Sequence, residues 1–568
     1  MATSKLSLTV SALLALGAAF PASNALAAAA ASADYIVEAR GYTWGLAATA
    51  VRRVGGRITH ELPIIDGVSA TLTPKQVAQL RKDGRLDLFA DASVKTQDTG
   101  NTQPVAMTDI YQRSFVGADL LAAQGIDGAG VVVAVVDSGI PQGSNSMHRD
   151  LNGTPRVLAE YDSIGSVLVD VSHPYVSNVT DTFGHGTHVS SLILGSDTYD
   201  EVLNGRPLGV APNAKLISVK AFDSTGTSTY ASVINGLNWI LTNKATYGNI
   251  RVVNMSFGAK PQSYYWNDPI DQAVMKLWQA GIVVVASAGN FGPTAQSIAV
   301  PGNTPYAITV GAMTDNWTPT NPAGQGIASF SSTGPTYEGF IKPEVVAPGG
   351  HLVGKMYSAT QALAAAHPEF FTSTNNLLVM SGTSQAAAVT TGAVALMLQA
   401  NPALTPDQVK CRLMASATSL VNSSGKAAYT VFQQGAGMIS AYNAVYSQAA
   451  NCANQGLNVA KDIAGTTHYG GPAHQDATTG NFYVLDSTGK RITADGYLWN
   501  KAFAKNLGYL WNNGYLWNNG YLWNNGYLWN NGYLWNNGYL WNNGYLWNQN
   551  AVAPASAPAA TESWNSQE

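Results

Sequence analysis

The sequence predicts an α/β fold in which a mostly parallel β-sheet lies between helices. Short runs of Val and Ile indicate strands that are buried on both faces, which is typical of parallel sheets. These runs alternate with amphipathic segments of helical period, as in domains built from βαβ units. The apolar runs are 131–136, 216–222, 252–255, 282–286 and 307–311, and the helical segments include 230–242 and 270–280.

The composition narrows the classes of protein to consider. Of the 568 residues, 46% are hydrophobic and 11% are charged, which excludes a disordered chain and a coiled coil. The 30 Lys and Arg residues against 34 Asp and Glu give a formal charge of −4, so no positive field exists to hold nucleic acid. The length allows roughly two to four domains.

Residues 1–30 have the pattern of a secretory signal peptide. Lys5 precedes an apolar run at 6–20 and a small-residue stretch at 21–30, which contains the Ala-x-Ala site 25–27. The apolar run falls short of the roughly 20 residues that span a bilayer. We therefore expect an extracellular protein, with or without association with the cell surface.

Residues 33–95 predict a small α+β unit of ferredoxin-like order, βαββαβ. The expected strands are 35–39, 57–65, 67–72 and 86–92, with helices at 45–54 and 73–83. Gly55-Gly56 can end the first helix, and Thr73 caps a second helix whose first residue is Pro74.

The composition changes beyond residue 450. We expect the α/β domain to cover residues 107–450 and a linker to follow at 451–495. Gly-Tyr-Leu-Trp-Asn-Asn repeats then occupy 496–549, and a disordered tail occupies 550–568. Since the period of six is even, an extended repeat places its Tyr and Trp on one face, which suits binding to cell envelope or polysaccharide. The alternative is an aromatic low-complexity spacer without fixed structure.

Four motifs in the α/β region carry side chains of catalytic type. Asp137 ends the first strand, His185 lies in Gly-His-Gly-Thr-His-Val, Asn290 ends a later strand, and Ser384 opens a helix expected at 385–398. Taken singly, each has a structural explanation as a turn former or helix cap. Together they supply the carboxylate, base, oxyanion donor and nucleophile that peptide hydrolysis by serine requires.

The order Asp, His, Ser on an α/β pattern is the one found in subtilisins. From about 125 to 447 the chain resembles the subtilisin-like serine endopeptidases (subtilases, peptidase S8), in particular secreted bacterial members. Further landmarks of this resemblance are Gly209-Val210-Ala211-Pro212, Asn254-Met255-Ser256, Phe330 to Pro335, Lys342-Pro343-Glu344 and Ala347-Pro348-Gly349.

The resemblance implies a role for each catalytic residue. Asp137 would orient His185, His185 would act as general base, Ser384 would form the acyl-enzyme, and Asn290 would stabilise the oxyanion. One wall of the first specificity pocket would be Ser256, Phe257 and Gly258, and the other Ala286, Ser287, Ala288 and Gly289. Because neither wall carries a charge, we expect an apolar or bulky residue before the cut bond.

The chain departs from the family at two places near the site. The family commonly has Met after the nucleophile and Ala-Gly after the His-Val pair, whereas this chain has Gln385 and Ser190-Ser191.

Residues 33–95 resemble the family's inhibitory prosegment, which assists folding, occupies the cleft and is then removed. Cleavage is expected near 93–106.

The resemblance implies no cofactor for the chemistry, and we predict no metal ligands, although relatives often bind structural Ca²⁺. Residues 197–201 are acidic enough for a weak calcium site or a solvated loop. Cys411 and Cys452 are expected to form one disulfide or to remain two free thiols.

The alternative function is that of a surface-binding protein that uses the aromatic repeats, with the peptidase domain as a scaffold.

Overall fold

The computed structural model describes residues 32–96, 110–141, 146–169, 180–198, 205–316, 325–421, 427–485, 491–492 and 515–516. The expected signal peptide, the tail 550–568 and nearly all of the repeats lie outside these residues. The described residues contain no helix with the length and apolar character needed to cross a membrane.

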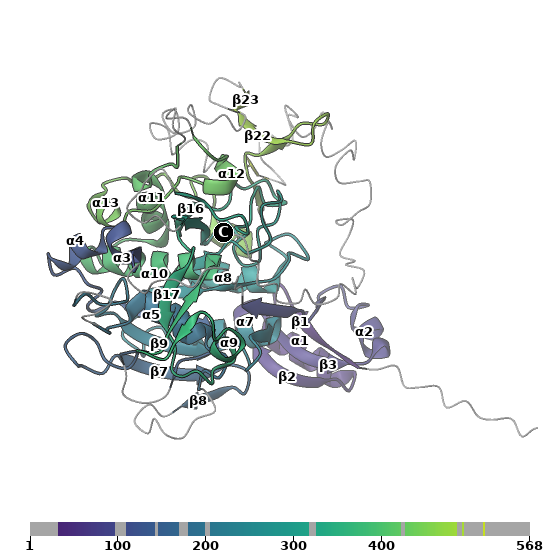
Figure 1. The fold of residues 1–568 in the computed structure, drawn as a ribbon. Helices are drawn as coiled ribbons and strands as arrows, with labels where there is room; N and C mark the ends of the chain where they lie inside the picture. The colour runs from purple at the N-terminus through teal and green to yellow at the C-terminus, as the bar shows by residue number, and fades with distance from the viewer. Residues whose placement is uncertain are drawn as a thin grey trace, which may run out of the picture.

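The predicted sheet is confirmed (Figure 1). Within the described residues it has nine strands in the order β15-β14-β13-β11-β6-β9-β7-β8, with β16 also paired to β14. Six of its strand pairs are parallel, and β8 and β15 add antiparallel edges. The strands are β6 (Val132–Asp137), β7 (Val157–Asp162), β8 (Val167–Val169), β9 (Lys215–Lys220), β11 (Val252–Met255), β13 (Val283–Ser287), β14 (Ile308–Thr314), β15 (Gly326–Ile327) and β16 (Val345–Pro348).

The central strands are buried on both faces, as their continuous apolar runs predict. Every residue of β6, β11, β13 and β14 is buried. Helices α5 and α10 pack together against the sheet, as do α7 and α8. The helices of this domain are α3 (Gln112–Phe115), α4 (Ala118–Ala122), α5 (His185–Leu194), α7 (Tyr230–Thr242), α8 (Pro269–Gln279), α9 (Ala362–Ala366), α10 (Thr383–Ala400), α11 (Pro406–Ser416), α12 (Val431–Gln434) and α13 (Ala441–Tyr446).

Residues 33–90 form a separate four-stranded antiparallel sheet in the order β2-β3-β1-β4. The element order is the predicted βαββαβ, with a short 3-10 helix η1 after β2. Thr73 and Gln76 form the capping box of α2, which explains where that helix begins. The elements are β1 (Ala33–Glu38), α1 (Trp44–Arg53), β2 (Arg57–Leu62), η1 (Pro63–Ile65), β3 (Gly67–Leu72), α2 (Pro74–Leu80) and β4 (Asp87–Ala90).

Among the small sheets of the described residues, two lie close to the elements of the site. A three-stranded sheet joins β5 (Ser93–Thr96) to β10 (Thr227–Thr229) and β12 (Phe257–Gly258). A second one, formed by β17 (Leu352–Lys355), β18 (Phe371–Thr372) and β19 (Leu377–Met380), leads into α10.

Residues 452–485, here called the C-terminal segment, pack against the α/β domain, where the sequence predicts only a linker. Helix α14 (Val459–Ile463) contacts α8. Its residue Asp462 is 2% exposed and accepts hydrogen bonds from the hydroxyls of Tyr265 and Tyr306 at 2.5 and 3.1 Å. The segment continues in β20 (Tyr469–Gly470), β21 (His474–Gln475), β22 (Phe482–Leu485) and β23 (Arg491–Ile492), and β20 pairs with β24 (Tyr515–Leu516). These tertiary contacts could not be predicted from the composition of the segment.

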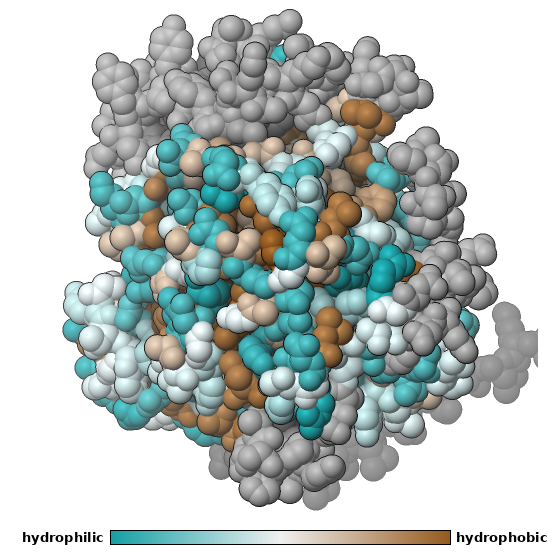
Figure 2. All heavy atoms as spheres, turned by 90° about the vertical axis from the view of Figure 1, so that its left-hand side faces the viewer, coloured by the Kyte–Doolittle hydropathy of each residue, from teal (hydrophilic) through white to brown (hydrophobic). Residues whose placement is uncertain are grey.

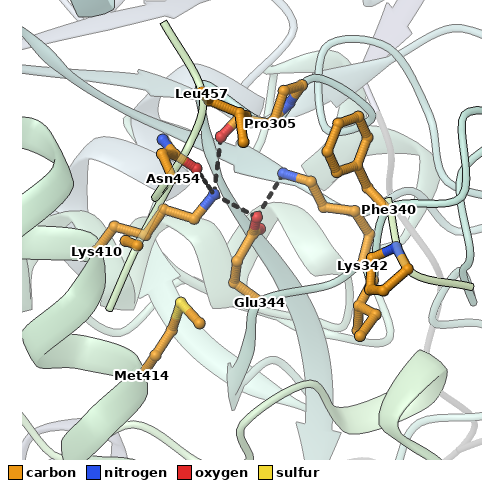
Figure 3. Close-up of a pocket in the computed structure, with 11 residues that line it drawn as sticks. Pro305, Phe340, Lys342, Glu344, Lys410, Met414, Asn454 and Leu457 are labelled. Atoms are coloured by element: carbon orange, nitrogen blue, oxygen red, sulfur yellow. Dashed lines mark hydrogen bonds and ion pairs between the residues drawn. The ribbon is translucent and has the colours of Figure 1, made fainter. Parts of the chain in front are cut away.

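A buried charge cluster joins this C-terminal segment to the domain (Figure 3). Glu344 Oε1 lies 2.7 Å from Lys342 Nζ and 2.6 Å from Lys410 Nζ. Lys410 also donates to the carbonyl of Pro305 at 2.8 Å and contacts Asn454 at 3.4 Å. Burial lowers the pKa of Lys342 to about 7, although Glu344 opposes this effect. The cavity that these side chains line is about 20 Å³, too small for a ligand larger than water.

The cysteines lie beside this cluster. Cys411 of α11 and Cys452 form a disulfide with a Cα–Cα distance of 5.0 Å. The bond therefore ties the start of the C-terminal segment to α11.

The surface reflects the low charge content of the chain. On the face in Figure 2, hydrophilic and apolar residues are interspersed, and the apolar ones gather only in small groups. Leu120 and Tyr446, for example, are 59% and 48% exposed. Scattered exposed apolar side chains of this kind are normal for folded proteins.

We predict that Glu344→Gln destabilises the fold strongly, because it removes the buried carboxylate that both Lys342 and Lys410 contact. Breaking a buried ion pair from one side costs about 3–5 kcal/mol. The measurement is the free energy of unfolding in denaturant. Glu369→Gln is the matched control, since the Glu369 side chain is 53% exposed. A loss from Glu344→Gln no larger than that of the control would contradict the prediction.

Candidate active site

A buried hydrogen bond joins the end of β6 to the start of α5. His185 Nδ1 lies 2.7 Å from Asp137 Oδ1, and the two side chains are 0% and 1% exposed. Asp137 is the last residue of β6, and His185 is the first residue of α5. The contact orients the imidazole so that Nε2 faces away from the carboxylate.

The pKa of Asp137 depends on its burial and on the neighbouring imidazole of His185. Burial raises the pKa of Asp137, while the nearby His185 and a hydrogen bond from Ser138 N–H at 2.7 Å lower it. A buried carboxylate is costly unless it is paired. The pair with His185 is therefore what keeps a charged Asp137 tolerable at this position.

The glycine after His185 is required by close packing. Gly186 N–H donates to Ser138 Oγ at 2.8 Å. A Cβ at Gly186 would lie only 2.3 Å from the carbonyl oxygen of Gly139. The Gly-His-Gly motif thus lets the start of α5 approach the end of β6 closely enough for the Asp137–His185 bond.

Ser384 is held on the neighbouring strand end. It is the second residue of α10, and its Oγ donates to the Ser256 carbonyl at 2.9 Å. The Ser256 hydroxyl in turn donates to the Ser384 carbonyl at 2.9 Å. These reciprocal bonds fix the start of α10 against the residue that follows β11.

The sheet register explains why these anchors are neighbours. Strands β6 and β11 are parallel, and Val136 pairs with Met255. Asp137 and Ser256 are the next residue on each strand, and adjacent strands lie about 4.8 Å apart. His185 is attached to one of these strand ends and Ser384 to the other, so the parallel register brings together residues far apart in sequence.

The amide of Asn290 is oriented by Thr383. Its Oδ1 accepts from Thr383 N–H at 3.0 Å and from Thr383 Oγ1 at 2.8 Å. Thr383 Oγ1 also accepts from Gly289 N–H at 3.2 Å. Because Thr383 binds the amide oxygen, the Nδ2 donor is directed to the side of the amide opposite Thr383.

The two predicted pocket walls lie side by side. Met255 of β11 pairs with Ala286 of β13, and Ser287 Oγ donates to the Phe257 carbonyl at 3.0 Å. Beyond the first wall, Ala259 forms an isolated bridge with Val300. All seven predicted wall residues are buried, and none is charged: Ser256, Phe257, Gly258, Ala286, Ser287, Ala288 and Gly289.

Strands β10 and β12 form the two edges of a groove that β5 fills. The predicted wall residues Phe257 and Gly258 form β12. The sequence did not lead us to expect β10, which follows a turn in which Asp223 Oδ1 accepts from the N–H groups of Thr225 and Thr227. The Asp-Ser-Thr-Gly turn before Thr-Ser-Thr was the available signal. Strand β5 lies between the two edges, paired with both.

Of the two departures near the site, one is explained by its contacts. Ser191 Oγ donates to the His188 carbonyl at 2.6 Å and accepts from Lys355 N–H at 2.8 Å, which links α5 to β17. Gln385 is fully buried, and we find no structural reason for it. His188 contacts the Leu378 carbonyl at 3.1 Å and is not part of the Asp137–His185 pair.

Comparison with known proteins now decides the family. Residues 128–437 match the model of the Subtilase family, more than half of the chain. The chain belongs to the subtilase family. It is therefore a serine endopeptidase, as the sequence predicts.

Individual subtilases resemble the chain over most of its described length. Serine protease AprX from Bacillus subtilis is 36% identical over 334 residues, which cover 57% of this chain and 68% of AprX. Subtilisin E from Bacillus subtilis is 32% identical over 371 residues, 65% of this chain and 80% of its own. The structure of fervidolysin from Fervidobacterium pennivorans, a keratinolytic enzyme, superposes with a TM-score of 0.56 at 22% identity. That match covers 74% of this chain and 62% of fervidolysin, and it shows the fold alone.

We predict that Thr383→Val lowers kcat about tenfold with little change in KM, because the Asn290 amide loses the hydroxyl that orients it. The measurement is steady-state hydrolysis of a peptide substrate. Thr390→Val is the control, since Thr390 Oγ1 bonds only within α10, to the Ala386 carbonyl at 3.0 Å. Equal kcat values for the two variants would exclude an orienting role for Thr383.

Proposed function

We propose that this subtilase is secreted as a precursor and cuts peptide bonds with the triad Asp137, His185 and Ser384. The observation that carries the proposal is the buried 2.7 Å contact between His185 Nδ1 and Asp137 Oδ1 at the edge that also holds Ser384. The role of Asn290 as oxyanion donor rests on the orientation of its amide by Thr383.

The acylation step begins with proton transfer. His185 Nε2 takes the proton of Ser384 Oγ as the oxygen attacks the scissile carbonyl carbon. The carbonyl oxygen becomes an oxyanion, which Asn290 Nδ2 and the Ser384 N–H stabilise. The carbon–nitrogen bond then breaks, and His185 gives its proton to the departing amine.

Deacylation repeats the sequence with water. His185 removes a proton from the water molecule as its oxygen attacks the ester carbonyl, and the same donors hold the second oxyanion. When the ester bond breaks, His185 returns the proton to Ser384 Oγ. Asp137 keeps the imidazole in one orientation throughout and offsets its positive charge.

The position of β5 supports an inhibitory role for residues 33–95. Thr96 pairs with Phe257, Lys95 with Gly258, and Thr96 N–H donates to the Gly226 carbonyl at 3.1 Å. The segment therefore fills the groove between β10 and β12 in the manner of an extended peptide. Because β5 and β12 are antiparallel, the chain that leaves β5 after Thr96 heads toward Ser256, the residue that holds Ser384.

The maturation cut is accordingly expected directly after β5, within the proposed region 93–106. Residues 97–109 lie outside those described. Cutting there would leave residues 33–96 as a separate fragment that still occupies the groove.

Residues 33–95 also dock on two helices of the enzyme. Asp91 Oδ1 accepts from Ala231 N–H at 2.8 Å at the start of α7, where a carboxylate is favoured by the helix dipole. Ile64 N–H donates to Asn238 Oδ1 at 3.1 Å on the same helix. On α8, Gln272 Nε2 donates to Glu38 Oε2 at 3.2 Å.

The expected substrates are proteins or peptides with an apolar or bulky residue before the cut, because the pocket walls are uncharged. Secretion rests on the signal-peptide pattern at 1–30 and on the similarity to subtilisins. The rival function, surface binding with an inactive scaffold, does not account for a buried Asp–His pair beside an anchored serine. In this proposal the repeat tail adds binding to cell envelope or polysaccharide.

We predict that Ser384→Ala abolishes hydrolysis and leaves residues 33–95 covalently attached, because the nucleophile that would cut the precursor is gone. The expected loss of kcat is about a millionfold, as in a subtilisin without its nucleophile, and adding His185→Ala should cost little more. N-terminal sequencing and intact mass of the purified protein measure maturation. A Ser384→Ala precursor that matures alone would exclude Ser384 as the nucleophile.

A buried carboxyl at the docking surface makes the affinity of the inhibitory segment depend on pH. Burial raises the pKa of Glu38 from 4.5 to about 8, although Arg40 and Gln272 lower it. Asp87 and Asp268 also face Glu38 and raise it further. If undocking restores an ordinary pKa, docking takes up a proton between these two values, so affinity falls as pH rises through this window.

We predict that the inhibition constant of the segment 33–96 against the matured enzyme rises by up to about tenfold per pH unit within this window. Glu38→Gln should flatten the dependence, because a neutral amide has no proton to lose. Glu61→Gln is the control, since Glu61 is 48% exposed and pairs only with Arg52. A pH dependence that is the same for Glu38→Gln and Glu61→Gln would refute the role of Glu38.

A further inference from the structure

Arg156 is the largest fully buried side chain of the described chain, and backbone carbonyls surround it. Its Nη1 donates to the carbonyls of Leu194 and Pro212, the second at 2.9 Å. Its Nη2 donates to the carbonyls of Ser146, at 2.7 Å, and Arg149. Each terminal nitrogen of the guanidinium thus binds two carbonyl oxygens, from three separate stretches of chain.

Carbonyl oxygens that converge in this way are the kind of ligand that hard metal cations prefer. The acidic stretch considered for calcium begins at Asp197, close to this cluster. However, Asp197 Oδ2 accepts from Ser146 Oγ and lies 3.9 Å from Lys355 Nζ. Among the described residues no group of three His, Cys, Asp or Glu side chains could hold a metal ion. The donors present therefore do not fit a metal site, since the position between them is filled by the chain itself.

The charge balance favours a resident cation. Burial lowers the pKa of Arg156 to about 10, while the carboxylates of Asp150 and Asp197 oppose this shift. Arg156 is still charged at neutral pH. Ser196 Oγ adds to the cluster by donating to the carbonyls of Arg149, at 2.8 Å, and Ser146, at 3.1 Å.

We propose that the guanidinium of Arg156 takes the place of a structural metal ion at the junction of residues 146–150, the end of α5 and residues 210–213. The junction is then held together without calcium. An arginine suits this position because its planar fork of donors can reach several fixed acceptors at once, whereas a lysine ammonium is compact.

The junction matters for the active site because it ends the helix that His185 begins. Leu194 is the last residue of α5, and its carbonyl is one of those that lack a partner within the helix. A cation at this end also interacts favourably with the helix dipole. The chain continues through Gly209 and Val210, whose N–H groups donate to the carbonyls of Gly195 and Leu192 at 2.8 and 3.0 Å.

The test uses the full-length Ser384→Ala chain, which cannot digest itself, and compares Arg156→Met and Arg156→Lys in that background. Melting temperature and hydrogen exchange of the Gly209 and Val210 amides are measured with EDTA and with calcium chloride. The parent should give the same exchange rates in both solutions. Arg156→Met should lower the melting temperature by at least about 3 °C and speed exchange at least about tenfold, because four carbonyls lose their hydrogen bonds to the guanidinium. Arg156→Lys should give a melting temperature and exchange rates between those of the parent and of Arg156→Met. If Arg156→Met does not fold, the comparison of Arg156→Lys with the parent is the test.

Arg149→Met is the matched control on the same loop. The Arg149 guanidinium is exposed and donates to the Gly153 carbonyl at 2.7 Å, so this variant should behave like the parent. Two results would overturn the proposal. One is slower exchange of the Gly209 and Val210 amides in calcium than in EDTA for the parent. The other is an Arg156→Met variant whose melting and exchange match those of Arg149→Met.

Discussion

The parallel register of β6 and β11 is the constraint on which the rest of the site depends. It places the residues after Val136 and Met255 side by side, so that helices α5 and α10 start at adjacent points of one sheet edge. Both strands are fully buried, and a shift of register would expose apolar side chains or remove ladder hydrogen bonds. The packing energy of the core therefore also fixes the relative positions of Asp137, His185 and Ser384.

In the proposed function, the groove between β10 and β12 that β5 fills serves both inhibition and catalysis. An extended chain between β10 and β12 satisfies backbone donors on both edges, whatever its side chains are. Selectivity must then come from the pocket walls, which are neutral and built of small residues apart from Phe257. Residues 33–95 make further contacts outside this groove, with α7 and α8.

Much of this arrangement could be predicted from sequence, because it follows from local patterns. The strand 252–255 and the helix 230–242 have the predicted ends, since apolar runs and the Thr229 cap define them. The helix at Ser384 begins two residues earlier than predicted, and His185 itself is the first residue of α5. The apolar period alone could not show these starts, because the first turns carry polar catalytic residues.

The features that sequence did not predict are tertiary. Strand β10 is only three residues long, and its role depends on its position opposite β12. From sequence alone, an arginine such as Arg156 would be predicted to lie on the surface, because the carbonyls that surround it come from distant parts of the chain. Residues 457–485 have the composition of a linker, yet Asp462 binds two tyrosines of the domain.

The contacts of Asp462 have a consequence for the order in which the protein is assembled. Its partners Tyr265 and Tyr306 precede it by 197 and 156 residues. During synthesis both hydroxyls must stay without this acceptor until a segment well beyond Ser384 has emerged. A chain nicked between the disulfide and Asp462 would keep every catalytic residue but leave two buried phenols without their acceptor. The segment that completes the core is thus made after the whole of the region 128–437 that defines the family.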